Sequence, residues 1–152
     1  MNSAMTEYEE TKRPFAILFI DLDKFKAVND TFGHSIGDEL LIIVSKRIKK
    51  AIRNDDYIVR IGGDEFVVII KIASEKSLLR IVNSIKNTFT HDIVIKGNII
   101  SIDISIGIAT YPSNGKTIEE LLNNADKNMY INKQSRQQQQ INFGYPAKSS
   151  QH

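Results

Sequence analysis

The chain has 152 residues, of which 41% are hydrophobic, so its length and composition fit one domain built around a single buried core. Its 20 basic and 18 acidic residues leave a formal net charge of +2, which is too small to predict a nucleic-acid-binding stripe or a membrane-surface patch. Because the chain contains no cysteine, disulfides, thiolate metal sites and a cysteine nucleophile are excluded, and a metal ion would need oxygen or imidazole ligands.

The N-terminal third predicts a buried strand followed by a long helix. Residues 1–13 are polar and indicate the end of a helix. The run from Phe15 to Ile20 is apolar without alternation, which predicts a central strand covered on both faces. Gly33 and Gly37 then indicate a bend before residues 38–53, where apolar side chains recur at the spacing of an amphipathic helix.

The middle of the chain predicts a hairpin and a second helix. Two runs rich in β-formers, residues 57–61 and 66–72, flank Gly62-Gly63-Asp64-Glu65. The simplest interpretation is a β-hairpin whose turn carries two adjacent acids. Residues 77–89 then predict a second amphipathic helix.

Two more strands and a final helix are predicted in the last third. Residues 93–95 and 99–110 flank a turn, and the second run alternates isoleucines on one face. Residues 117–132 predict the last helix, with Thr117 as its N-cap. The resulting order, β-α-β-β-α-β-β-α, predicts an α+β fold in which helices flank one central, mainly antiparallel sheet.

Three acids fall where the first strand and the hairpin turn would meet. Asp21 follows the buried run, and Asp64 and Glu65 lie in the turn. If the hairpin pairs beside that strand, the carboxylates converge at one sheet edge and can hold divalent cations such as Mg²⁺ through oxygen. Two such ions can activate a hydroxyl and neutralise phosphate charge. Taken singly, however, an Asp after a strand more often caps a turn.

Several short segments match one known pattern in order and spacing. They are Asp21–Asp30, Gly33–His34, Gly37–Asp38, Gly62–Phe66, Ser105–Ala109, Ala125–Asp126 and Met129–Tyr130. Together they resemble the GGDEF family of diguanylate cyclases over the region from Phe15 to Lys133. The resemblance implies a nucleotidyl cyclase or palm-like fold with a ferredoxin-like βαββαβ core. We expect residues 1–136 to form the catalytic domain and residues 137–152 to be a polar, disordered tail.

The resemblance implies a metal site and a catalytic pair. Asp21, the backbone carbonyl of Leu22, Asp64 and Glu65 would hold Mg²⁺ or Mn²⁺, with two ions per active site. Asp64 and Glu65 would be the catalytic residues, and Asp64 would help to activate the 3′-hydroxyl of GTP.

The resemblance also implies a GTP site. Asn29 and Asp38 would bind guanine, since a carboxylate accepts from the N1 and N2 donors that distinguish guanine from adenine. His34 would lie beside the nucleotide, although a structural role is an equal alternative. The other substrate-binding residues would be Lys24, Phe25, Lys26, Gly62, Gly63 and Lys133. For Phe25 core packing is the alternative, and Lys24 and Lys26 could be ordinary surface cations.

Arg53 and Asp56 match the spacing of the family's RxxD inhibitory site for cyclic di-GMP. Arginine offers a planar fork for phosphate or guanine, and an acid three residues later can accept from guanine. The alternative is an exposed ion pair at a helix end.

The sequence departs from the family pattern at both ends. The usual Asp-x-Leu-Thr-Gly-Leu-x-Asn-Arg segment is absent, so we expect an upstream sensory or regulatory domain in a longer protein. Near the C-terminus Lys133 aligns, but the usual glycine is missing and Arg136 lies one position early. No apolar run reaches the roughly 20 residues of a membrane-spanning helix, so we expect no membrane contact in this segment. The lack of cysteine is compatible with the cytoplasm, and we expect a cytoplasmic domain, either by itself or as part of a larger, membrane-bound sensor protein.

The expected function is condensation of two GTP molecules into cyclic di-GMP and pyrophosphate, with a homodimer supplying both halves of the reaction. One alternative is a non-catalytic module that binds GTP or cyclic di-GMP, although the intact Gly62–Phe66 motif favours an enzyme. A cyclase that makes mixed or adenine-containing dinucleotides is a weaker alternative, because Asp38 favours guanine.

Overall fold

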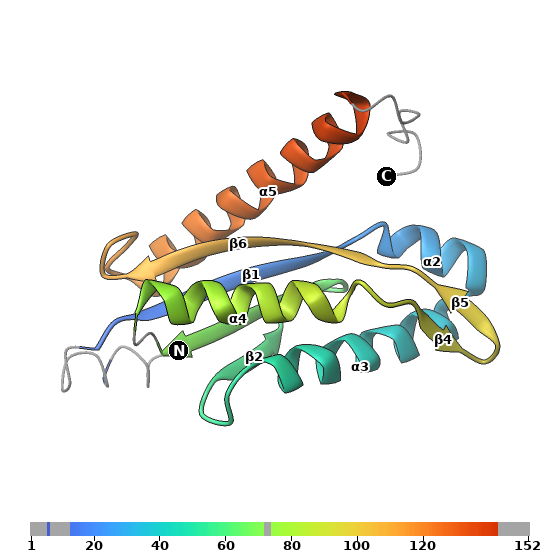
Figure 1. Ribbon diagram of the computed structural model, residues 1–152, viewed down its shortest axis with the longest axis horizontal. Coiled ribbons are helices and arrows are strands. Elements are labelled where there is room, and N and C mark those ends of the chain that lie inside the picture. Colours follow the sequence, from blue (N-terminus) through green and yellow to red (C-terminus); the bar gives the residue numbers. More distant parts are fainter. Residues whose placement is uncertain (1–5, 7–12, 72–73, 143–152) are drawn as a thin grey trace.

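A four-stranded antiparallel sheet lies at the centre of the computed structural model, which describes residue 6, residues 13–71 and residues 74–142, with side chains described through residue 135 (Figure 1). The strand order is β2-β3-β1-β6. These strands are β1 (Phe15–Asp23), β2 (Tyr57–Arg60), β3 (Glu65–Lys71) and β6 (Asp103–Tyr111). Because β1 pairs with both β3 and β6, it is the central strand that the sequence predicts.

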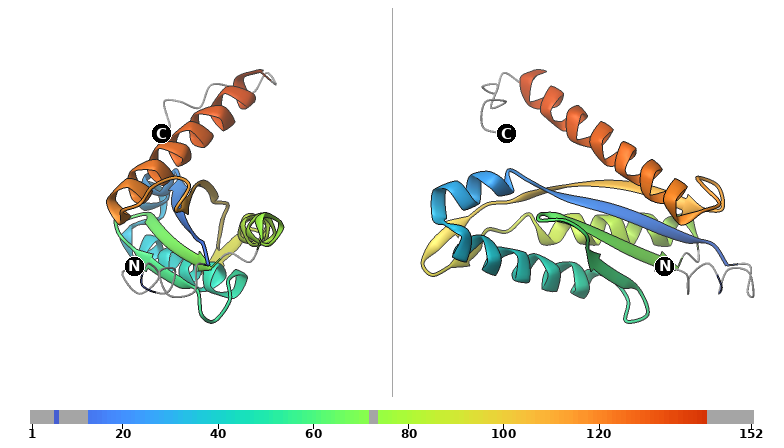
Figure 2. Two further views of the ribbon diagram at one scale, coloured as in Figure 1. Left: turned by 90° about the vertical axis from the view of Figure 1, so that its left-hand side faces the viewer. Right: turned by 180° about the vertical axis from the view of Figure 1, so that it is seen from behind.

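Helices cover both faces of this sheet, which confirms the predicted α+β arrangement. One face carries α3 and α4 and the other carries α5 (Figure 2). Their bounds are α3 (His34–Ala51), α4 (Glu75–Thr88) and α5 (Ile118–Asn142). Alternate residues of β1 enter the two cores, with Leu18 and Ile20 on the α3 side and Ile17 and Phe19 on the α5 side. The unbroken apolar run therefore reflects burial on both faces.

One short helix is not predicted by the sequence. Helix α2 (Phe25–Phe32) lies between β1 and α3, and α3 begins at His34 rather than at residue 38. Only Phe25 and Val28 of α2 are buried, so its apolar stripe is too short to stand out from its polar neighbours. Gly33 has a φ of 94°, which ends one helix and allows the next to start at once.

The predicted strand over residues 99–110 is in fact divided. Strands β4 (Ile93–Ile95) and β5 (Asn98–Ile100) form a separate two-stranded sheet, whereas β6 joins the central sheet. The small sheet lies beside the N-terminal half of α3, where Lys96 Nζ is 3.3 Å from Glu39 Oε1 (Figure 1). Its packing against a helix, rather than against a strand, explains why the isoleucine alternation did not reveal the break.

Helix α5 begins as predicted but continues further. Thr117 Oγ1 accepts a hydrogen bond from the Glu120 backbone N–H at 3.1 Å, which confirms the N-cap. The helix runs through Asn142 rather than ending at Asn132, because glutamine is a good helix former. Although α5 has 25 residues it is polar, and no helix in the described part of the chain is both long and apolar enough to span a bilayer. Of the tail predicted over residues 137–152, residues 137–142 instead continue α5, and residues 143–152 lie outside the described residues. The predicted helix end in residues 1–13 also lies almost entirely outside them.

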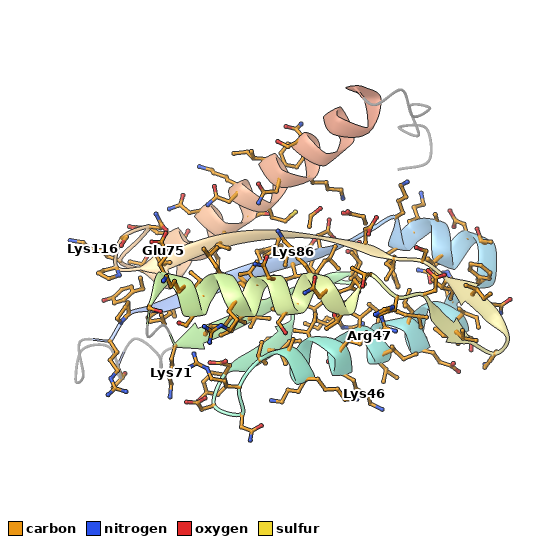
Figure 3. All side chains as sticks on the ribbon, viewed as in Figure 1. Lys46, Arg47, Lys71, Glu75, Lys86 and Lys116 are labelled. Atoms are coloured by element: carbon orange, nitrogen blue, oxygen red, sulfur yellow. The ribbon has the colours of Figure 1, made fainter. Side chains whose placement is uncertain are left out.

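Arg47 joins α3 to the end of α4. Its guanidinium donates to the carbonyl oxygens of Thr88 at 2.6 Å and His91 at 3.2 Å (Figure 3). A cation is favourable there because the last carbonyls of a helix lack partners within the helix. This contact stabilises the position of α3, which carries Asp38.

Asparagines on α5 cover the outer edge of β6. Asn128 and Asn132 donate through Nδ2 to carbonyl oxygens of β6 at 2.8 and 2.7 Å. The helix can approach this closely only because residue 107 is glycine, since a Cβ there would lie 1.9 Å from the Ala125 carbonyl oxygen. These bonds satisfy an exposed strand edge and orient the helix next to Lys133.

Candidate active site

The three acids predicted to converge do so at the end of β1. Asp21 lies directly opposite Glu65 in the β1–β3 ladder, so the two side chains emerge on the same face of the sheet. Asp64 lies in the adjoining turn, which is tied to β1 by a hydrogen bond of 3.1 Å from the Leu22 N–H to the Asp64 carbonyl oxygen. The pairing of the hairpin beside β1 is therefore what brings the acids together.

Lys133 of α5 completes this cluster. Its Nζ donates to Asp21 Oδ2 at 3.0 Å and lies 3.9 Å from Asp23 Oδ1. Asp23 in turn accepts a hydrogen bond of 2.9 Å from the Ser105 hydroxyl. The sequence predicts that Lys133 belongs to the site, but the network of Asp23 and Ser105 that orients the acids was missed.

The electrostatics of the cluster show that the acids repel one another. Burial raises the pKa of Asp64, and the negative charge of Asp21 raises it further. Burial also raises the pKa of Glu65, followed by the charges of Asp21 and Asp64. Burial alone would lower the pKa of Lys133, but its hydrogen bond to Asp21 and the surrounding carboxylates outweigh burial and raise it. The cluster therefore favours a positive charge among its carboxylates.

We expect Asp64→Asn to raise the Tm of the metal-free protein at neutral pH. Because the folded protein raises the pKa of Asp64, this group stabilises the fold at low pH and loses that contribution as pH rises from 3.8 through the raised value. Solvent screens the partly exposed group, so we expect an increase of roughly 2–4 °C, or about 1 kcal/mol. Circular dichroism melting in a chelator at several pH values measures the effect. A Tm that is unchanged at neutral pH would contradict it.

The donor set at this edge fits a hard divalent cation. The carboxyls of Asp21 and Asp64 lie close enough for the charge of Asp21 to raise the pKa of Asp64, and Leu22 donates its backbone N–H to the Asp64 carbonyl oxygen at 3.1 Å. Oxygen ligands of this kind suit Mg²⁺. Within the described residues no group of three His, Asp or Glu side chains has metal-holding geometry, so the side-chain donors are the carboxylates of Asp21 and Asp64, with Glu65 opposite Asp21 in the ladder. The ammonium of Lys133 supplies positive charge at Asp21.

The two residues predicted to bind guanine lie on neighbouring helices. Asn29 is on α2 and Asp38 is on α3, and the helices contact each other. Asn29 Oδ1 is buried and has no hydrogen-bond partner among the described residues. Gly37 makes room for it, since a Cβ at residue 37 would lie 1.8 Å from this oxygen. Asp38 and His34 are exposed, so their side chains are accessible to a ligand.

The start of α2 offers backbone donors near the acids. Lys24 is the N-cap in a left-handed conformation with φ 64°, and no side chain caps the helix. Lys24 is half-buried and Lys26 is exposed, whereas Phe25 is buried in the core, as its alternative interpretation holds. The uncapped backbone N–H groups can therefore bind an anion.

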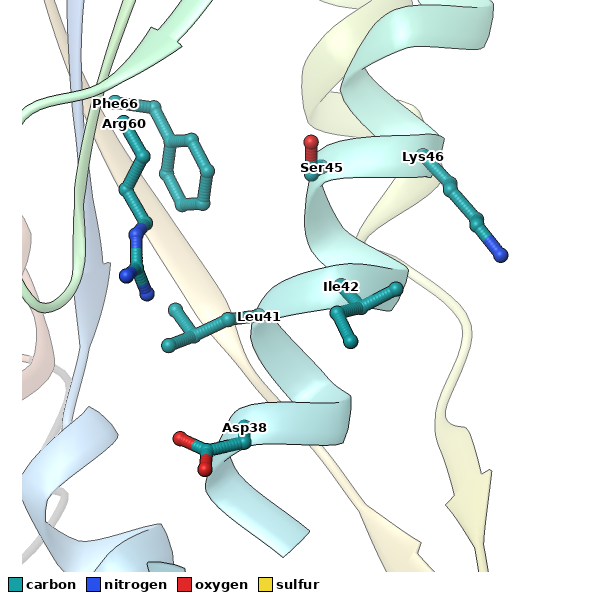
Figure 4. Close-up of a pocket in the computed structure, with 7 residues that line it drawn as sticks. All are labelled: Asp38, Leu41, Ile42, Ser45, Lys46, Arg60 and Phe66. Carbon is teal, nitrogen blue, oxygen red and sulfur yellow. The ribbon is translucent and has the colours of Figure 1, made fainter. Parts of the chain in front are cut away.

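A groove of about 600 Å³ separates α3 from the β2–β3 hairpin (Figure 4). It is lined by Asp38, Leu41, Ile42, Ser45, Lys46, Arg60 and Phe66. Of these the sequence singles out Asp38, as a guanine-binding residue. At the tip of the hairpin, a Cβ at Gly63 would meet nothing within 4 Å, so packing does not require glycine there.

Comparison with known proteins identifies the family. Residues 1–139 match the family model described as diguanylate cyclase, GGDEF domain. The chain belongs to the GGDEF family. The bifunctional diguanylate cyclase/cyclic di-GMP phosphodiesterase MucR of Pseudomonas aeruginosa is 42% identical over 130 residues, which cover 86% of this chain and 19% of MucR. Diguanylate cyclase TpbB of the same species is 38% identical over 135 residues, which cover 88% of this chain and 31% of TpbB.

A solved GGDEF domain has the same architecture. The GGDEF domain of TpbB (YfiN) from Pseudomonas aeruginosa has a TM-score of 0.84 at 38% identity, covering 88% of this chain and 78% of that one. The predicted palm-like α+β fold is thereby confirmed. Because this GGDEF domain corresponds to a third or less of MucR and TpbB, most of each relative has no counterpart in it.

In this GGDEF domain Arg53 and Asp56 form an ion pair with each other, which is the alternative to an inhibitory site for cyclic di-GMP. Arg53 Nε lies 3.5 Å from Asp56 Oδ2. Asp56 is 2% exposed and accepts from the backbone N–H groups of Arg53 at 2.9 Å and Lys71 at 3.3 Å. The Arg53 guanidinium is half exposed and donates to the Lys71 carbonyl. Asp56 therefore stabilises the turn, and of the two residues in this pair Arg53 is the one whose side chain is exposed.

Several groove residues of this GGDEF domain could not be singled out from sequence. Leu41 belongs to the apolar stripe of α3, so nothing distinguishes it from a core residue. Arg60 is a lone cation on a short strand, so no sequence pattern marks it as a site residue. The one available signal is that Arg60 lies two residues after the partly buried Ile58 and therefore on the same face of β2. The side chain of Arg136 lies outside the described residues.

Proposed function

We propose that this GGDEF domain is a diguanylate cyclase that condenses two GTP molecules into cyclic di-GMP. The observation that carries the proposal is the convergence of Asp21 and Asp64 beside Lys133 at the end of β1. Carboxylates drawn together despite their repulsion are typical of sites that bind cations and transfer phosphoryl groups. The family and its curated diguanylate cyclases support the same activity.

The described residues offer contacts for the base and the triphosphate of one GTP. Asp38 would accept from the guanine N1 and N2 donors, and Asn29, whose Oδ1 lacks a partner among the described residues, would bind the base beside it. The uncapped N-terminus of α2, at Phe25 and Lys26, would bind the triphosphate through backbone N–H groups. The acids at Asp21 then lie near the reacting phosphate.

Mg²⁺ or Mn²⁺, two ions per site, would be held by Asp21, Asp64, the Leu22 carbonyl and Glu65. When bound, the ions would polarise the attacking hydroxyl and neutralise charge on the phosphates. Lys133 would then release Asp21 and donate to the triphosphate, which needs a cation in the same region.

The reaction conserves atoms through two equivalent displacements. Each 3′-oxygen forms a bond to the α-phosphorus of the other GTP, and the bond from that phosphorus to pyrophosphate breaks. Asp64, whose pKa burial raises, accepts the proton of the 3′-hydroxyl. Two GTP molecules thus yield one cyclic di-GMP and two pyrophosphates.

A homodimer would be required, because the described residues of one domain offer one set of acids and one base site. Two copies would face each other so that each GTP attacks the other. A sensory or regulatory domain elsewhere in a longer protein would control this pairing. Cyclic di-GMP could then inhibit by binding at Arg53, where the exposed guanidinium is the available contact and Asp56 is already engaged.

Incubation of micromolar protein with GTP and Mg²⁺, followed by chromatography, tests the proposal. We expect cyclic di-GMP and pyrophosphate, more product when two copies are joined through a fused dimerisation helix, and none after chelation of the metal. GTP binding without product in the forced dimer would contradict the proposal and favour a non-catalytic nucleotide-binding module. In a parallel incubation that contains both ATP and GTP, adenine-containing dinucleotides would contradict the assignment of guanine to Asp38.

A further inference from the structure

Arg60 is a groove residue to which the proposed reaction gives no role. It extends from β2 toward Leu41, and Asp38 extends from α3 on the same side of the helix (Figure 4). The residues between them, Leu41 and Phe66, give the groove apolar walls. The volume of about 600 Å³ falls within the roughly 300–1,000 Å³ of small-molecule sites.

The strand fixes the direction of Arg60. Tyr57 and Val59 are exposed and lie opposite Ile69 and Val67, which belong to the α5-side core. Arg60 alternates with Val59 and lies opposite Phe66, which belongs to the α3-side core. The guanidinium therefore emerges on the face that carries the groove.

No fold contact accounts for Arg60. Among the described residues, its guanidinium makes no hydrogen bond or ion pair, in contrast to Arg47 and Arg53, which donate to backbone carbonyls. The side chain of Arg60 is exposed, so its truncation removes little packing. A directed cation without a structural partner is available to a ligand.

We infer that Arg60 recognises the O6 and N7 acceptors of the guanine base while Asp38 accepts from its N1 and N2 donors. This inference rests on the proposed function. The planar guanidinium fork matches O6 and N7 of guanine, and adenine presents a donor in place of O6. A carboxylate and a guanidinium in one groove thus recognise both polar edges of guanine, and Arg60 determines specificity for the base.

A nucleotide lacking N7 tests this contact directly. Calorimetry compares 3′-deoxy-GTP with 3′-deoxy-7-deaza-GTP in the presence of Mg²⁺, since neither nucleotide has the attacking hydroxyl. For the wild type we expect roughly tenfold weaker binding of the 7-deaza analogue. For Arg60→Met the ratio of the two dissociation constants should fall close to one. Arg60→Lys should also lower the ratio, because an ammonium lacks the planar fork.

Lys46→Met is the matched control, because Lys46 lines the same groove but points away from Arg60 and Asp38 (Figure 4). This variant should keep the tenfold ratio. Equal binding of both nucleotides by the wild type would overturn the inference. A tenfold ratio retained in Arg60→Met would also overturn it, and uniformly weaker binding of both nucleotides would then indicate a phosphate contact. If the wild type bound neither nucleotide, the proposed function would be overturned as well. If the wild type made cyclic di-GMP but Arg60→Met kept the wild-type ratio of dissociation constants, only the role of Arg60 would be overturned.

Discussion

Replacing Asp21 with asparagine is expected to lower the rate of cyclic di-GMP synthesis by roughly 10³-fold while the fold is retained. Asp21 supplies a carboxylate to the proposed cation site and holds Lys133 at 3.0 Å. Asparagine keeps the shape of the side chain but removes the charge that a divalent cation requires. Initial rates from chromatography measure the loss, and circular dichroism checks the fold.

Asp92→Asn provides the matched control for this experiment. Asp92 is exposed and precedes β4, outside the proposed site, so the same chemical change should leave the rate within about twofold. A rate for Asp21→Asn that equals that of Asp92→Asn would contradict the assignment of Asp21.

Gly107→Ala is expected to have the largest effect on stability. A Cβ at residue 107 would lie 1.9 Å from the Ala125 carbonyl oxygen and 2.2 Å from the Met129 nitrogen, both backbone atoms of α5. The helix would have to move away from β6, which breaks the bonds from Asn128 and Asn132. We expect a loss of about 3 kcal/mol, or roughly 6–12 °C in Tm.

Gly63→Ala is the control for this substitution. A Cβ at residue 63 would meet nothing within 4 Å, and Gly63 is not among the residues with positive φ. Its free energy of unfolding should therefore change by less than about 0.5 kcal/mol. Equal melting temperatures of the two variants, measured by calorimetry, would contradict the close packing of α5 on β6.

Much of this fold could be predicted because burial leaves a strong sequence pattern. The apolar run of β1, the stripe of α3 and the hairpin at Gly62–Glu65 are each dictated by contacts that extend over many residues. Helix α2 could not be predicted, because it buries only Phe25 and Val28. Where few residues are buried, the apolar pattern is too short to distinguish a helix from a loop.

The candidate site shows the same limit. Asp21, Asp64 and Lys133 were predicted through motifs, and the structure brings them together. The burial of Asp56 was not predicted, because the local sequence around an aspartate does not show whether its carboxylate is exposed or is buried against backbone N–H groups. Arg60 was missed for a related reason, since its importance depends on the helix across the groove.

A crystal structure of the protein with Mg²⁺ and 3′-deoxy-GTP would show whether the acids at the end of β1 hold metal and nucleotide. We expect metal density bound by Asp21, Asp64 and the Leu22 carbonyl, guanine at Asn29 and Asp38, and Lys133 turned from Asp21 to the triphosphate. Nucleotide bound away from these residues, or Lys133 still paired with Asp21 in a site without metal, would contradict this expectation.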